Sequence, residues 1–77
     1  MVSRVIEAVT VFGDPLARIF ADEDHTEKEA REIIVGYSAA RHLLLVRFTE
    51  RTNGRVRIFS ARRVTKPEQQ DYEESSN

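Results

Sequence analysis

The sequence contains no cysteine, so neither a disulfide nor a thiolate zinc site can stabilise this chain of 77 residues. Its two histidines, His25 and His42, stand far apart in the sequence and are too few for a metal cluster. No apolar run approaches the roughly 20 residues that cross a bilayer, and the first residues do not form a signal peptide. We therefore expect no metal, no cofactor, no membrane contact and a place in the cytoplasm.

The charged residues are distributed unevenly along the chain. Eight of the twelve basic residues lie between Arg41 and Lys66, and this segment holds a single acid, Glu50, so eight minus one leaves it at +7. The remainder holds four basic residues and twelve acids, or −8, although the whole chain carries only −1. A concentrated basic surface in a chain of nearly neutral charge indicates a polyanionic partner, above all nucleic acid.

Two helices are predicted, one at each end of the chain. Ser3 suits a helix N-cap, and apolar residues at helical spacing follow as far as Phe12. Gly13 suits a left-handed C-cap there, directly before an Asp-Pro pair that ends the helix. Near the other end, Thr65 and Glu68 form a capping-box pattern that starts the second helix. Residues 75–77 are expected to be a frayed tail.

Strand-like segments fill the middle of the chain. A short apolar stretch at Leu16–Ala21 precedes an acidic loop at Asp22–Ala30, and three β-rich runs follow at Arg31–Ser38, His42–Arg51 and Arg55–Arg63. The short connections favour an antiparallel three-stranded meander, to which the short strand is added. The sequence therefore predicts one small α+β domain over residues 1–77.

Alternation along the strand at 42–51 predicts two sets of side chains on opposite faces. The set that should face the helices is Leu44, Val46, Phe48 and Glu50. The set that becomes cationic toward the turn, and should face solvent there, is Leu43, Leu45, Arg47, Thr49 and Arg51. The second set makes this hairpin the candidate binding surface.

The register of the next strand stays open, because two turns fit Asn53-Gly54. A two-residue type I′ turn pairs Glu50 with Arg57 and adds Arg62 to the cationic face. A three-residue loop pairs Thr49 with Arg57 instead, which adds Arg55 and Arg57 to that face and moves Arg62 to the other side. Both registers leave at least one further arginine on the cationic face.

Two interpretations of the basic hairpin also stay open. Exposed arginines on a sheet are often only solvated, and charge on an edge strand prevents aggregation. However, like charges placed side by side across strands destabilise a sheet. An anionic partner explains why such a cluster is present.

Several segments resemble the BrnT toxins of bacteria, in the same order and over nearly the whole chain. They are Phe12-Gly13-Asp14-Pro15, Asp22-x-Asp24-His25, Arg31, Val35-Gly36-Tyr37-Ser38, Thr49-Glu50-Arg51, Arg57-Ile58-Phe59-Ser60-Ala61-Arg62 and Tyr72-Glu73. The resemblance implies a RelE-like α+β fold and a ribonuclease toxin that blocks translation. It also implies an antitoxin partner with a ribbon-helix-helix domain, through which alone the pair contacts operator DNA.

The chain departs from the BrnT pattern at its start. Members of the family begin with a strand and a helix, whereas this sequence begins at Met1 with residues that resemble the family's second helix. We therefore expect an open sheet edge and an apolar surface without its usual cover. Such surfaces favour a homodimer.

RNA cleavage without a metal requires a base for the 2′-hydroxyl, stabilisation of the phosphate charge and a proton for the leaving oxygen. Arginine suits the second role through its planar fork of donors. The catalytic candidates are Arg51, Arg62, Glu50 and His25, and the RNA-binding candidates are Arg47, Thr49, Arg57 and Arg55. Glu50 is either a base or a partner of a neighbouring arginine, and His25 is either an acid–base group or part of the acidic loop's own structure.

Two further functions remain alternatives. A shortened toxin relative could bind an antitoxin or RNA without cleaving. A plain RNA-binding domain is the third candidate, although it needs aromatic side chains for base stacking, and Phe48 and Phe59 are expected mostly in the core. We expect His42 to be incidental and Tyr72 to pack the last helix onto the sheet.

Overall fold

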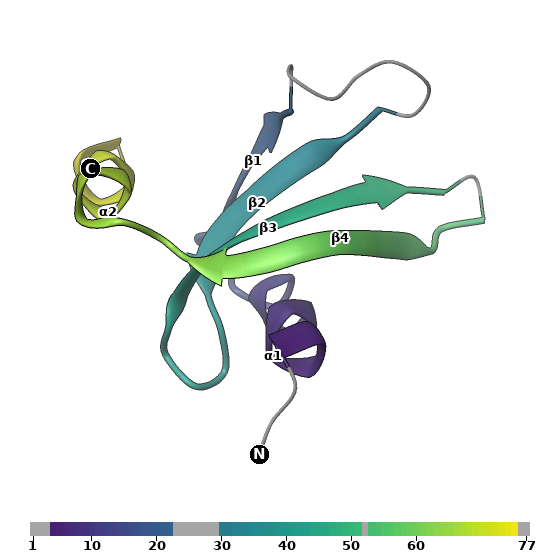
Figure 1. Ribbon diagram of the computed structural model, residues 1–77, viewed down its shortest axis with the longest axis horizontal. Helices are drawn as coiled ribbons and strands as arrows, with labels where there is room; N and C mark the ends of the chain where they lie inside the picture. Colours follow the sequence, from purple (N-terminus) through teal and green to yellow (C-terminus); the bar gives the residue numbers. More distant parts are fainter. Residues whose placement is uncertain (1–3, 23–29, 52, 76–77) are drawn as a thin grey trace.

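The computed structural model describes residues 4–22, 30–51 and 53–75, which form a four-stranded sheet with two helices (Figure 1). The elements in chain order are α1 (Arg4–Val11), β1 (Arg18–Ala21), β2 (Glu32–Tyr37), β3 (Leu43–Glu50), β4 (Val56–Arg63) and α2 (Lys66–Ser75). All neighbouring strands are antiparallel, in the order β1-β2-β3-β4. The predicted α+β fold, a meander with a short added strand and a helix at each end, is confirmed.

The two helices cover opposite faces of the sheet, and each has its own apolar cluster. The cluster beneath α1 contains Ala8, Val11, Ile34, Leu44, Val46 and Phe48. The cluster beside α2 contains Val35, Leu43, Leu45 and Tyr72. The expectation that one set of β3 side chains faces both helices is therefore wrong. Leu43 and Leu45 belong to the second set, and α2 buries them because it packs on that face.

The helix ends follow the predictions in part. After α1, the amides of Phe12, Gly13 and Asp14 each donate to a carbonyl three residues earlier, at 3.0 to 3.2 Å. The turn therefore tightens without a left-handed residue, and the predicted left-handed conformation of Gly13 is wrong. Positive φ angles occur instead at Arg41 (64°) and Gly54 (79°), in the two hairpin turns. Ser3 lies outside the described residues.

The start of α2 is the predicted capping box. The Thr65 amide donates to Oε1 of Glu68 at 2.8 Å, and the Glu68 amide donates to Oγ1 of Thr65 at 3.4 Å. Further along, the buried Tyr72 donates its hydroxyl to the carbonyl of Leu16 at 3.0 Å, and its ring meets Tyr37 edge to face at 6.1 Å. Tyr72 thus anchors α2, as predicted.

The segment between α1 and β1 passes very close to β2. Asp14 accepts hydrogen bonds from the amides of Leu16, at 2.9 Å, and Tyr37, at 2.7 Å. A Cβ atom built on Gly36 would lie 2.7 Å from the Cβ atom of Ala17. Glycine at position 36 is therefore what allows this segment to cross the sheet.

The outer surface of α1 is apolar and open to solvent. Val5, Ile6, Val9 and Phe12 are exposed by 36% to 62%. No helix among residues 4–22, 30–51 and 53–75 has the length and apolarity to span a membrane.

Candidate functional site

A β-bulge in β4 combines the two registers that the sequence leaves open. Near the turn, Thr49 pairs with Arg57, as the three-residue loop predicts. The pairing then shifts by one residue at Phe59, and Arg62 returns to the face that carries Arg47. Arg47, Arg57 and Arg62 consequently share one face, which neither register alone predicts. We call the sheet surface opposite α1 that carries Arg31, Arg47, Arg57 and Arg62 the arginine face.

Phe59 lies at the centre of two cation–π contacts on the arginine face. The guanidinium carbon of Arg31 lies 4.1 Å from the ring centroid, and that of Arg57 lies 5.3 Å away. The ring is only half-buried, so the expectation that Phe59 belongs mostly to the core is wrong. A partly exposed aromatic ring beside guanidinium groups is a surface on which a nucleic acid base can stack.

Arg47 is anchored to the sheet by a buried acid. Its Nε atom lies 3.5 Å from Oδ2 of Asp22, whose side chain is 5% exposed, whereas the Arg47 side chain is 36% exposed. A buried carboxylate requires a cation near it. Arg47 therefore offers a fixed charge, in part neutralised by Asp22, to anything bound on this face.

Arg62 forms a two-pronged ion pair with Glu68 at the start of α2. Its NH1 and NH2 atoms donate to the two carboxylate oxygens at 2.8 and 2.9 Å. The Arg62 hydrogen bonds, with that from the Thr65 amide, lower the pKa of Glu68 from 4.5 to about 2, and the same pair raises the pKa of Arg62. Arg62 thus ties β4 to α2 while lining the arginine face.

Lowering the pH is expected to loosen α2 from the sheet as Glu68 becomes protonated. Because its folded-state pKa is depressed, ionised Glu68 stabilises the fold above pH 4.5, and this contribution is lost as the pH falls toward 2. The ion pair is more than a third exposed, so its contribution is at most about 1 kcal/mol. NMR signals of the Gln69 and Tyr72 amides should report the change.

A Glu68→Gln variant is the control for this pH dependence. Glutamine keeps a hydrogen-bond acceptor at position 68 but does not titrate, so the α2 amide signals should no longer move between pH 4.5 and about 2. An unchanged response in the variant would show that another carboxylate controls α2.

Other predicted site residues lie off the centre of this surface. Glu50 pairs with Val56, so it lies on the face that carries α1, as strand alternation predicts, and not opposite Arg57, as the two-residue turn would place it. Arg51 and Arg55 are exposed beside the turn, where the Arg51 amide donates to the Arg55 carbonyl at 2.7 Å.

Thr49 and His25 differ from the other candidates. Thr49 is 4% exposed and donates its hydroxyl to the carbonyl of Ala30 at 2.7 Å, so it serves the fold and cannot reach a phosphate. His25 lies outside the described residues.

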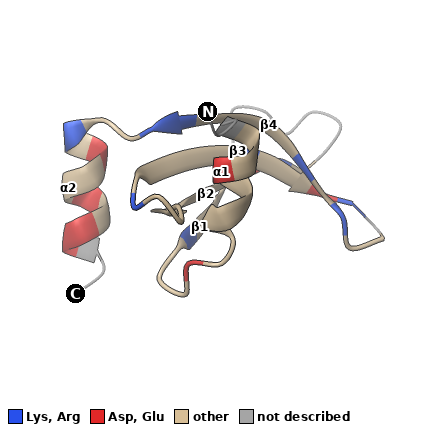
Figure 2. Cartoon of the chain, turned by 90° about the horizontal axis from the view of Figure 1, so that it is seen from below, with Lys and Arg blue, Asp and Glu red and all other residues tan. Residues whose placement is uncertain are grey.

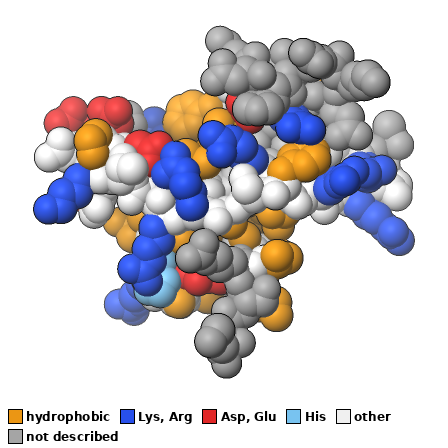
Figure 3. Space-filling model, viewed as in Figure 1, with side chains coloured by type: hydrophobic (Ala, Val, Ile, Leu, Met, Phe, Trp, Pro, Cys, Tyr) orange, Lys and Arg blue, Asp and Glu red, His pale blue; other side chains and the backbone are white. Residues whose placement is uncertain are grey.

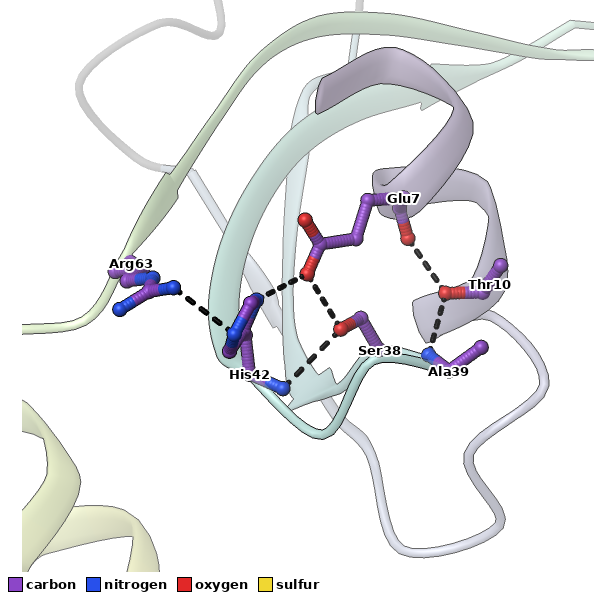
Figure 4. A network of polar contacts seen from close by, with 6 residues as sticks. All are labelled: Glu7, Thr10, Ser38, Ala39, His42 and Arg63. Carbon is purple, nitrogen blue, oxygen red and sulfur yellow. Dashed lines mark hydrogen bonds and ion pairs between the residues drawn. The ribbon is translucent and has the colours of Figure 1, made fainter. Parts of the chain in front are cut away.

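A network of polar side chains on the α1 side of the sheet was not predicted (Figure 4). Nδ1 of His42 lies 2.7 Å from Oε2 of Glu7, and its Nε2 lies 2.9 Å from NH2 of Arg63. The Ser38 hydroxyl donates to the same Glu7 oxygen at 2.6 Å. The hydrogen bonds from Ser38 and then His42 lower the pKa of the Glu7 carboxyl. No spacing in the sequence connects these residues, so His42 was wrongly expected to be incidental.

An open groove of about 580 Å³ lies between α2 and the sheet. Its lining residues are Phe20, Val35, Leu45, Glu68, Asp71, Tyr72 and Glu74. Figure 2 shows the acidic segments of α2, and Figure 3 shows red side chains at the α2 end and blue ones from there across the face toward the β3–β4 turn. A polyanion is therefore attracted to the arginines of β3 and β4 and repelled by the carboxylates of α2.

Comparison with known families gives one match, which spans residues 4–68. The matching family is described as "Ribonuclease toxin, BrnT, of type II toxin-antitoxin system". The comparisons with curated proteins and with solved structures found no match. The family match covers α1, all four strands and the start of α2, and so includes every residue of the arginine face.

Proposed function

The chain belongs to the family of BrnT ribonuclease toxins of type II toxin–antitoxin systems, and from this membership we propose that it cleaves RNA on its arginine face without a metal. Cleavage of RNA in the cytoplasm would then inhibit translation. The observation that carries the proposal is the β4 bulge, which aligns Arg47, Arg57 and Arg62 on one face. Solvated surface charges need no such alignment.

The arginine face supplies two of the contacts that single-stranded RNA requires. Guanidinium groups bind phosphate oxygens in pairs of hydrogen bonds, and an aromatic ring accepts a stacked base. Phe59 is in contact with both Arg31 and Arg57, so a base on the ring has cations beside it. Arg51 and Arg55 extend the positive charge to the turn, where they contact the RNA backbone.

Arg57 and Arg62 are the proposed groups that stabilise negative charge on the phosphate during cleavage. Both side chains are exposed on the arginine face, and an arginine that strengthens its contacts in the transition state raises the rate. To do so, Arg62 first breaks one of its two hydrogen bonds to Glu68. Glu50 is removed from the proposed catalytic set because it lies on the other face. His25 stays a predicted acid–base group.

The antitoxin is the expected protein partner, because the family is one of toxin–antitoxin pairs. We propose that this antitoxin carries a ribbon-helix-helix domain and that operator DNA contacts only the antitoxin. We also propose that the fold is of the RelE type. Antitoxin binding should stop RNA cleavage.

The nuclease proposal is tested by incubating the purified chain with a long single-stranded RNA in EDTA. We expect cleavage, and we expect Arg57→Gln/Arg62→Gln to reduce its rate by about 100-fold or more, since two donors to the phosphate are removed. The control Arg4→Gln removes one charge from α1, which lies on the other side of the sheet, and should keep most of the activity. Thermal melting of each variant checks that it is folded.

A second function, RNA binding without cleavage, is favoured by one observation. Thr49 is buried and Glu50 lies on the opposite face, so the described part of the arginine face presents cations and a ring but no carboxylate or hydroxyl from β3. If folded protein binds RNA but leaves it intact with EDTA and with Mg²⁺, the binding function replaces the nuclease.

A further inference from the structure

His42 has the surroundings of an oriented base. A guanidinium only donates hydrogen bonds, so Nε2 of His42 accepts from Arg63 and the ring proton lies on Nδ1, directed at Glu7. Figure 4 shows the ring between these two side chains. The neutral ring therefore directs its lone pair toward the cation and its proton toward the carboxylate.

The carboxylate partner of the ring is held in place, and the network is open to solvent. The Ser38 hydroxyl donates to Glu7 and accepts from the His42 amide at 3.2 Å, which fixes the carboxylate to the β2–β3 turn. The His42 side chain is 38% exposed, and Arg63 is exposed. An oriented imidazole beside an accessible guanidinium is the arrangement that acid–base chemistry at a phosphate requires.

Strand β4 connects this network with the arginine face. Arg62 and Arg63 are consecutive residues, and alternation places them on opposite faces of the outermost strand of the sheet. An RNA strand that crosses the edge of β4 therefore meets Arg62 on one side, and Arg63 with His42 on the other. The two surfaces form a single path around this edge.

We propose that the reacting phosphate lies at the edge of β4, between Arg62 from the arginine face and Arg63 from the other face, with His42 as the general base and Glu7 as a positioning residue; this rests on the proposed nuclease function. A phosphate oxygen takes the Arg63 hydrogen bond, which releases Nε2 of His42. Nε2 then accepts the proton of the 2′-hydroxyl, the 2′-oxygen bonds to phosphorus, and the bond from phosphorus to the 5′-oxygen breaks. The 5′-oxygen takes a proton from water, and the ring later returns its proton to the resulting hydroxide.

The dependence of the cleavage rate on pH tests the role of His42. The charged groups around the ring are Glu7 from α1, Arg63 from β4 and the adjacent Arg41 in the turn. His42→Gln should lower the rate by about 100-fold or more and abolish its rise with pH. Glu7→Gln should lower kcat by about tenfold and leave KM nearly unchanged, because the ring loses the carboxylate that orients it.

Thr10→Val is the matched control for these variants. Thr10 accepts a hydrogen bond from the Ala39 amide at 2.8 Å and donates one to the backbone carbonyl of Glu7 at 2.6 Å, without contacting the ring or the Glu7 carboxylate. The rate and pH profile of the variant should therefore stay those of the unaltered chain. If the unaltered chain cleaves RNA and His42→Gln keeps both the rate and the profile, the role of His42 is overturned while the nuclease function stands.

A binding experiment separates the two proposals when no cleavage is seen. A 2′-O-methyl oligouridylate lacks the attacking hydroxyl, so NMR can follow it on the intact protein. Adding the oligonucleotide should shift the NMR signals of the Phe59 and His42 rings. In the Arg63→Gln variant the Phe59 signals should still shift, and the His42 signals should not. Movement of Phe59 alone overturns the path around β4. If neither ring signal moves, the proposal that the protein binds RNA is overturned. If both signals move but RNA is not cleaved, the role of His42 as general base is overturned.

Discussion

Phe48→Ala is expected to lower the free energy of unfolding by about 3–5 kcal/mol, the usual effect of removing a buried aromatic ring. Phe48 is 1% exposed, lies in the cluster beneath α1 and meets Phe12 edge to face, with ring centroids 5.0 Å apart. A domain of this size has a total stability of only about 4–12 kcal/mol. The variant should therefore be largely unfolded at room temperature or close to it, which urea denaturation followed by circular dichroism measures.

Phe20→Ala is the matched control for Phe48→Ala. It removes the same ring from a side chain that is 51% exposed, so its effect should be below about 1 kcal/mol. Phe48→Leu keeps most of the apolar volume and should cost less than about 2 kcal/mol. Equal loss in the Phe48 and Phe20 variants would contradict the separation of buried and exposed faces.

Gly36→Ala is expected to destabilise the fold by about 1–3 kcal/mol, as overpacking of a tight contact does. The new methyl would lie 2.7 Å from the Cβ atom of Ala17 and 3.2 Å from its backbone Cα atom. The segment between α1 and β1 must then move away and strain the Asp14 bond to the Tyr37 amide. A lower melting temperature in a thermal scan would show this.

A double-mutant cycle with Ala17→Gly isolates the contact. Removing the Cβ atom of Ala17 makes room for the methyl at position 36, so Gly36→Ala/Ala17→Gly should be less destabilised than the sum of the single variants. The backbone contact remains, so the rescue should be partial. Strict additivity would mean that the clash at Ala17 does not determine the cost.

The elements of the fold could be predicted from the sequence because local patterns determine them. The Thr65 and Glu68 pattern forms the capping box that starts α2, and the apolar runs form the predicted strands. The face that α2 covers could not be predicted, since it depends on where the chain goes after Arg63. Leu43 and Leu45 are as apolar as Leu44, and only the docking of Tyr72 distinguishes the two faces.

The candidate site could be predicted only as far as strand alternation holds. Strand alternation placed Arg47 on the cationic face, but it allowed either Arg57 or Arg62 there and not both. The bulge that brings both to this face carries no clear sequence signal. The network around His42 arises from tertiary packing, since α1 brings Glu7 to a residue 35 positions away. Thr49 was misjudged for the same reason: its partner is a backbone carbonyl from another segment, at Ala30.

The bulge at Phe59 also limits how β4 can change in evolution. One residue inserted or deleted in the turn before β4 is absorbed by a loop, at low cost in closure entropy. One residue inserted or deleted between Phe59 and Arg62 would instead exchange the sides on which Arg62 and Arg63 stand. Relatives of this chain should therefore vary in the length of the turn and keep a constant spacing from the bulge to the end of β4.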